Sequence, residues 1–81
     1  MPGKRRKLTP IEPRRLVRLF ERDGWRETGR AGRHMTLTKP GFKRPVTISF
    51  GRKPISPGVI RANMRTAEMT RRRYFELLDE V

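Results

Sequence analysis

His34 is the only histidine of the chain, and it is the residue with the clearest chemical potential. It follows a stretch that combines glycine with arginine, Gly29-Arg30-Ala31-Gly32-Arg33. An imidazole has an unperturbed pKa of about 6.5, so it can accept and release a proton near neutral pH. Cleavage of RNA by its own 2′-hydroxyl needs such a transfer, and it needs cations that stabilise the charge on the attacked phosphate. His34 is therefore a candidate general acid or base, and the alternative is an ordinary surface histidine.

The charge of the chain indicates a polyanionic partner. The sequence holds 21 Lys and Arg against 8 Asp and Glu, a formal net charge of +13. Most of the excess lies in residues 1–11 and in residues 26–61, where Glu27 is the single acid. Nucleic acid, an acidic protein and an anionic membrane surface are the partner classes that such a charge attracts. The candidate phosphate-binding residues in the middle segment are Arg30, Arg33, Lys39, Lys43, Arg44, Arg52 and Lys53.

Several other kinds of chemistry find no support in the sequence. There is no cysteine and only one histidine, so thiolate and multi-imidazole metal sites are excluded. The acids form no D-x-D or E-x-x-E cluster for Mg²⁺, and no phosphate-binding glycine-rich loop with the Walker spacing is present. We therefore expect neither a metal nor a small-molecule cofactor. No apolar run exceeds two residues, so we expect no transmembrane segment, no membrane partner and a cytoplasmic protein.

The elements that position His34 follow from periodicity. Glu12-Pro13 is a helix start, and the next apolar residues gather on one side of a helix that ends at Gly24. After Gly24 the period changes to two, which predicts strands over residues 25–30, 33–39 and 45–50. The predicted connections are a loop at Gly29 to Gly32 and a type II turn at Pro40-Gly41.

Alternation places His34 on the polar face of the second strand, while Met35 and Leu37 face the core. Ser56 is a predicted cap of a second helix, and Thr70 of a last, short one. The order α-β-β-β-α with a C-terminal helical extension predicts a two-layer α+β domain over residues 12–81. Residues 1–11 are predicted to be a basic, flexible arm. The residues predicted to face inward from the last two helices are Val59, Ile60, Met64, Ala67, Tyr74, Phe75, Leu78 and Val81.

Several short stretches, in this order, resemble the HicA family of bacterial toxins. Gly32-Arg33-His34 resembles the family's glycine–serine–histidine element, with Arg33 in place of serine and Met35 in place of a second histidine. Together the matching stretches extend from about residue 13 to residue 80. The others are Leu16 to Trp25, Val46-Thr47-Ile48, Ser56 to Arg61 and Tyr74 to Leu78.

The resemblance implies a double-stranded-RNA-binding-domain-like fold and an mRNA interferase, an RNA endonuclease that inhibits translation. It implies His34 as the catalytic histidine and an acidic HicB-type antitoxin as the protein partner. Two alternatives stay open. One is a non-catalytic RNA-binding module that uses the same basic sheet face, and the other is a protein-interaction module with an acidic partner.

Overall fold

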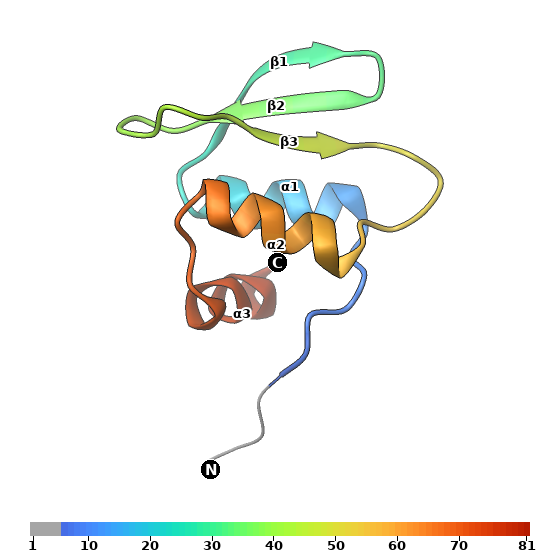
Figure 1. The fold of residues 1–81 in the computed structure, drawn as a ribbon, viewed down its shortest axis with the longest axis vertical. Helices are drawn as coiled ribbons and strands as arrows, with labels where there is room; N and C mark the ends of the chain where they lie inside the picture. The colour runs from blue at the N-terminus through green and yellow to red at the C-terminus, as the bar shows by residue number, and fades with distance from the viewer. Residues whose placement is uncertain (1–5) are drawn as a thin grey trace.

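The computed structural model describes residues 6–81 and contains three helices and one sheet (Figure 1). The elements are α1 (Pro13–Arg22), β1 (Arg26–Ala31), β2 (His34–Thr38), β3 (Val46–Ser49), α2 (Pro57–Thr66) and α3 (Arg71–Glu80). The sheet is antiparallel with the order β1-β2-β3. The predicted α+β class and element order are confirmed.

The first helix begins as predicted, with Glu12 at the N-cap and Pro13 in the first turn. Its apolar side is buried against the sheet, and Leu16, Leu19 and Phe20 are fully inaccessible to solvent. The chain then turns through Gly24, whose φ of 99° is readily adopted only without a Cβ. Trp25 follows in the core, where its ring meets that of Phe20 edge to face at 6.2 Å.

Two connections join the three strands, and each contains a tight turn that depends on a glycine. Gly41 has a φ of 89°, and the Phe42 N–H donates to the Lys39 carbonyl at 3.1 Å, as in the predicted type II turn. The first connection differs from the prediction, because β1 continues to Ala31 and only Gly32 and Arg33 form the turn. Gly32 has a φ of 59°, which suits the first central position of a two-residue hairpin turn.

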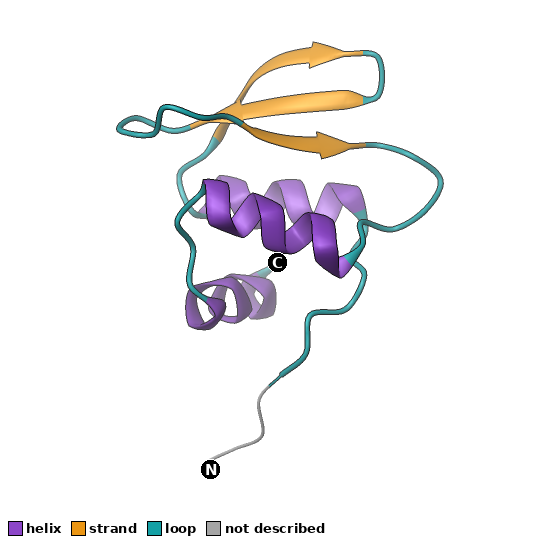
Figure 2. Ribbon diagram, viewed as in Figure 1, coloured by secondary structure: helices purple, strands orange, loops and turns teal. Residues whose placement is uncertain are grey.

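Helices α1 and α2 cover one face of the sheet, and α3 lies beyond them on the side away from the sheet (Figures 1 and 2). The predicted caps are present: Ser56 Oγ accepts from the Val59 N–H at 3.3 Å, and Thr70 Oγ1 from the Arg73 N–H at 3.0 Å. The C-terminal extension is therefore a ten-residue helix, as long as α1 and α2. Burial raises the pKa of the Tyr74 phenol in α3, since the phenolate would lose its hydration.

The buried side of α2 differs from the prediction at one position. Val59 is 46% exposed, whereas Asn63 is buried. Ile60, Asn63, Met64 and Ala67 follow the spacing i, i+3, i+4, i+7, and Val59 lies beside that stripe. In α3, Tyr74 and Leu77 are buried, while the other predicted inward residues are half-buried: Phe75, Leu78 and Val81.

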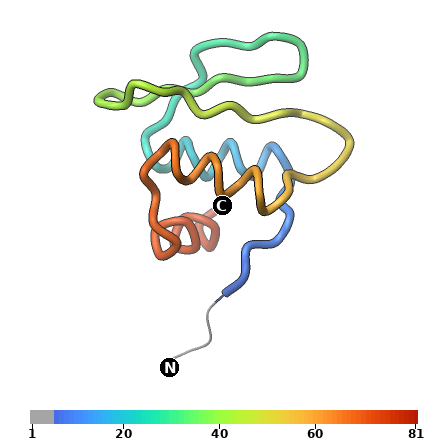
Figure 3. The backbone as a smooth tube through the Cα atoms, in the orientation of Figure 1, coloured from blue at the N-terminus to red at the C-terminus, as the bar shows by residue number. Residues whose placement is uncertain are grey.

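The segment before α1, whose path toward the N-terminus can be followed in Figure 3, is packed onto the domain from residue 8 by its buried side chains, where the sequence predicted a flexible arm. Leu8 and Ile11 are buried, and Ile11 exchanges two backbone hydrogen bonds with Ile55 at 3.1 and 2.7 Å. Arg6 pairs with Asp79 of α3 at 3.0 Å. The apolar residues within the basic segment explain the difference. Lys4 and Arg5 of the predicted arm lie outside the described residues.

Candidate nucleic-acid interface

The side of the sheet away from the helices is a polar surface, which we call the open face. Residues directly opposite each other in antiparallel strands point to the same side of the sheet. His34 of β2 is opposite Ala31 of β1 and Ser49 of β3, and the core residue Met35 points to the other side. The same rule gives all the residues of the open face: Arg26, Gly29, Ala31, His34, Thr36, Thr38, Thr47 and Ser49.

His34 is exposed on the open face, as alternation predicted. The Phe50 N–H donates to the Arg33 carbonyl at 2.6 Å, just beyond the pair that His34 forms with Ser49. Hydrogen-bonded and non-hydrogen-bonded pairs alternate along antiparallel strands, so His34 and Ser49 form a non-hydrogen-bonded pair. Side chains of such pairs are the closer ones. The Ser49 hydroxyl is therefore the polar group best placed to contact the His34 imidazole.

Two of the candidate phosphate-binding residues are committed to other contacts. The Arg30 Nε lies 3.2 Å from a Glu27 carboxylate oxygen, and the guanidinium lies 5.5 Å from the centre of the Phe50 ring. Lys39 approaches Asp23 at 3.7 Å and Phe42 at 5.3 Å. Arg30 is also opposite Met35, so it projects to the helix side of the sheet rather than beside His34.

A β-bulge explains the position of Arg30. The pairing of β1 with β2 shifts between Glu27 and Gly29, so that Thr28 has no residue directly opposite. The extra residue reverses the alternation in the rest of the strand. Arg26 lies before the bulge and is exposed on the open face, although it is not among the cations predicted to bind phosphate. The signal was present, because Arg26 follows Trp25, and a buried tryptophan at the strand start turns the next residue outward.

The other candidate cations lie at the two ends of the open face. Arg33 precedes His34, and Arg52 and Lys53 follow the end of β3, so these three are at the His34 end. Lys43 and Arg44 are in the loop between β2 and β3, at the opposite end. None of these five has a carboxylate within 4.0 Å among residues 6–81.

Hydroxyl and backbone groups fill the space between the two cationic ends. Thr36 and Thr47 are opposite each other at the middle of the open face, and Gly29 lies opposite Thr36 on the other side. No carboxylate belongs to the open face as the strand pairing defines it. The arrangement suits a chain of phosphates, whose oxygens accept hydrogen bonds and attract cations but are repelled by carboxylates.

Within the described residues, no three His, Asp or Glu side chains come together in a group that could hold a metal ion. No helix of that part of the chain is long and apolar enough to cross a membrane.

Comparison with known families agrees with these features. The family model described as the HicA toxin of bacterial toxin-antitoxin systems matches residues 13–69. The matched region begins at the start of α1, contains the whole sheet with His34, and ends just after α2. The helix α3 and the segment before α1 lie outside it. A search of curated proteins found no match.

Proposed function

The chain belongs to the HicA toxin family of bacterial toxin–antitoxin systems, and on this basis we propose that it is a metal-independent endoribonuclease. Its target in this proposal is mRNA, and cleavage inhibits translation. The observation that supports the proposal best is the position of His34, which is exposed on a face without carboxylates and lies at the end of the sheet where Arg33, Arg52 and Lys53 are found. We assign His34 the role of general acid or base.

The proposed reaction uses the RNA's own 2′-hydroxyl as the nucleophile. Its oxygen bonds to the adjacent phosphorus while the bond from phosphorus to the 5′-oxygen breaks. The products are a 2′,3′-cyclic phosphate and a 5′-hydroxyl. The His34 imidazole takes the proton from the 2′-hydroxyl, and the leaving oxygen receives a proton from solvent. General acid–base catalysis of this kind contributes about 10²- to 10⁴-fold to the rate.

The neighbours of His34 supply the rest of the site in this proposal. Arg33, Arg52 and Lys53 stabilise the negative charge that builds up on the phosphate. The Ser49 hydroxyl orients the imidazole from the opposite strand. Met35 occupies the position of a second histidine in the resemblance, and it is buried on the other face, so its side chain does not reach a phosphate bound at His34.

The protein partner in the proposal is an acidic antitoxin of the HicB type. An acidic surface laid over the open face would cover His34 and satisfy the unpaired cations at both ends.

The alternative is an RNA-binding module that does not cleave. One observation favours it: the open face, as the strand pairing defines it, holds one imidazole and no carboxylate, so it offers no second acid–base side chain for the other proton transfer.

Cleavage of a mixed-sequence single-stranded RNA in EDTA separates the two functions. The wild type and His34→Ala are purified side by side, so that a contaminating nuclease would be present in both. We expect both proteins to bind the RNA. We expect His34→Ala to cleave it at least 100-fold more slowly than the wild type. Equal binding without cleavage by either protein would establish the RNA-binding module instead.

A further inference from the structure

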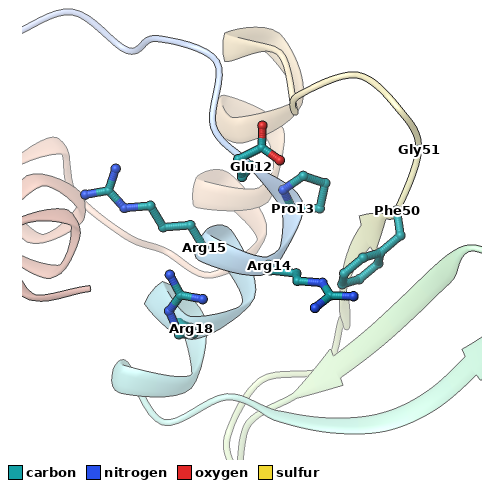
Figure 4. A pocket seen from close by; sticks show the side chains of 7 residues that line it. All are labelled: Glu12, Pro13, Arg14, Arg15, Arg18, Phe50 and Gly51. Carbon is teal, nitrogen blue, oxygen red and sulfur yellow. The ribbon is translucent and has the colours of Figure 1, made fainter.

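A second basic surface lies outside the open face, in a groove between α1 and the end of β3. The groove has a volume of about 480 Å³ and is open to solvent. Figure 4 shows the Arg14 side chain extending from α1 toward the ring of Phe50, which forms the opposite wall. Its lining residues are Glu12, Pro13, Arg14, Arg15, Arg18, Phe50 and Gly51.

The charges in this groove are poorly balanced. Arg14 and Arg18 are exposed, and neither has a carboxylate within 4.0 Å in the part of the chain that the structure describes. Arg15 donates to the Leu78 carbonyl at 3.0 Å, a contact that leaves its charge uncompensated. Glu12 is the only carboxylate among the lining residues. Like charges this close repel each other, so binding of an anion would stabilise the groove.

Phe50 gives the groove an aromatic wall. The ring is half-buried, with part of it packed against the core and part facing the groove. Arg30 adds a further guanidinium 5.5 Å from the ring centre. Aromatic rings that stack with bases, beside arginines that contact phosphates, are the usual means of binding single-stranded nucleic acid. An acidic protein surface would use the arginines but would have no need of the ring face that borders the groove.

The groove adjoins the His34 end of the open face. Phe50 follows Ser49, the residue opposite His34, and its N–H is bonded to the Arg33 carbonyl. A chain that crosses this end of the sheet can therefore contact His34 on one side and Phe50 on the other. The path bends around the end of a strand, which a flexible single strand can follow and a stiff duplex cannot.

We propose that this groove binds a nucleotide of single-stranded RNA next to the phosphate held at His34. The base stacks on Phe50, and Arg14 and Arg18 contact the flanking phosphates. The inference rests on the proposed function, because it takes RNA as the ligand of the open face. It adds a subsite formed by α1, where, within the described residues, the exposed Arg14 and Arg18 would otherwise have no partner but solvent.

The test measures RNA binding separately from cleavage. His34→Ala protein, which binds without cutting, is titrated with short single-stranded RNAs that carry 2-aminopurine at one position at a time. We expect the fluorescence of one position to change through stacking, and Phe50→Leu in the same background to abolish that change. Affinity should fall about tenfold with Phe50→Leu and be retained with Phe50→Tyr.

Exposed arginines provide the matched controls. We expect Arg14→Ala and Arg18→Ala each to weaken binding severalfold, and Arg72→Ala on α3 to have little effect. Arg72 is also exposed and has no carboxylate within 4.0 Å among residues 6–81. Thermal unfolding checks that each variant is folded. If Phe50→Leu does not fold, the affinities of Arg14→Ala and Arg18→Ala for RNA test the groove without it.

The outcomes for the groove and for the proposed function are distinct. If Phe50→Leu, Arg14→Ala and Arg18→Ala all leave RNA affinity unchanged, the proposal that the groove binds RNA is wrong, even if the wild type cleaves RNA. Equal weakening by Arg72→Ala would also overturn it, since only total charge would matter. RNA binding that depends on Phe50, in a wild-type protein that does not cleave, would support the groove and overturn the endonuclease.

Discussion

At the scale of single residues, the residue of β3 that pairs with His34 has the most direct consequence for the proposed chemistry. The sequence placed His34 on the polar face of its strand, but it could not show which side chain lies opposite. That depends on the register of β2 with β3, which pairs His34 with Ser49. The long-range pairing of strands is set by the whole sheet, so no local pattern around Ser49 marks it as a neighbour of the histidine.

Ser49→Ala tests this pairing. The hydroxyl is assigned to orient the imidazole, so its loss should lower kcat about tenfold while KM stays near the wild-type value. The measurement is steady-state cleavage of a fluorescent RNA. Thr47→Ala is the control, because Thr47 lies on the same face but opposite Thr36. If both variants behave alike, or if Ser49→Ala changes only KM, Ser49 does not position His34.

At the scale of elements, periodicity predicted where the helices and strands lie and failed where the backbone departs from regularity. The buried faces of α1, β2 and β3 follow simple apolar spacing, and the structure confirms them. Arg30 is the instructive failure. Counting alternate residues from Trp25 turns Arg30 toward the open face, but the bulge at Thr28 reverses it. Because of the bulge at Thr28, the Arg30 side chain does not lie beside His34, where it was expected to bind phosphate.

The C-terminal helix shows how elements outside the matched region are fixed to the domain. Asp23, at the end of α1, lies 3.1 Å from Arg73 of α3 and 3.7 Å from Lys39, which follows β2. Arg22 of α1 pairs with Glu80 at the end of α3. Lys39 therefore has a structural contact that its position in a basic segment could not reveal.

Thr70→Ala is expected to destabilise the protein by about 1 kcal/mol, because the Arg73 N–H loses its capping partner. Urea denaturation followed by circular dichroism measures the change. Thr66→Ala is the matched control, since its hydroxyl donates to the Ala62 carbonyl within α2 and caps no helix. Equal losses of stability in the two variants would mean that the Thr70 cap contributes nothing specific.

At the scale of the whole molecule, the charges of the described residues are segregated. Carboxylates on and near α3 pair with arginines on the helical side, through Arg6–Asp79, Arg22–Glu80 and Arg73–Asp23. Such exposed pairs contribute little to stability, but each of them offsets an arginine charge on that side of the protein. The open face has no carboxylate, and among residues 6–81 neither Arg26 nor the five cations at the two ends of this face has one within 4.0 Å. These cations, none of which has a carboxylate partner among the described residues, lie where we propose that RNA binds.

The salt dependence of RNA affinity measures how many cations of the protein neutralise phosphates. If about six cations neutralise phosphates of single-stranded RNA, the slope of log K against log salt should be about −4. Fluorescence anisotropy of His34→Ala with labelled RNA gives the slope. Arg33→Ala should reduce its magnitude by about 0.7, whereas Arg72→Ala should leave it unchanged. A slope near zero would contradict electrostatic binding of RNA altogether.

The chemical identity of the cleavage products tests the central claim most directly. A defined single-stranded RNA is incubated with the wild type in EDTA, and the masses of the fragments are measured. The account predicts a 5′ fragment that ends in a 2′,3′-cyclic phosphate, a 3′ fragment that begins with a 5′-hydroxyl, and no cut beside a 2′-deoxy nucleotide. Fragments with a 5′-phosphate and a 3′-hydroxyl, or cleavage at a 2′-deoxy position, would contradict attack by the 2′-hydroxyl with His34 as the proton-transfer group.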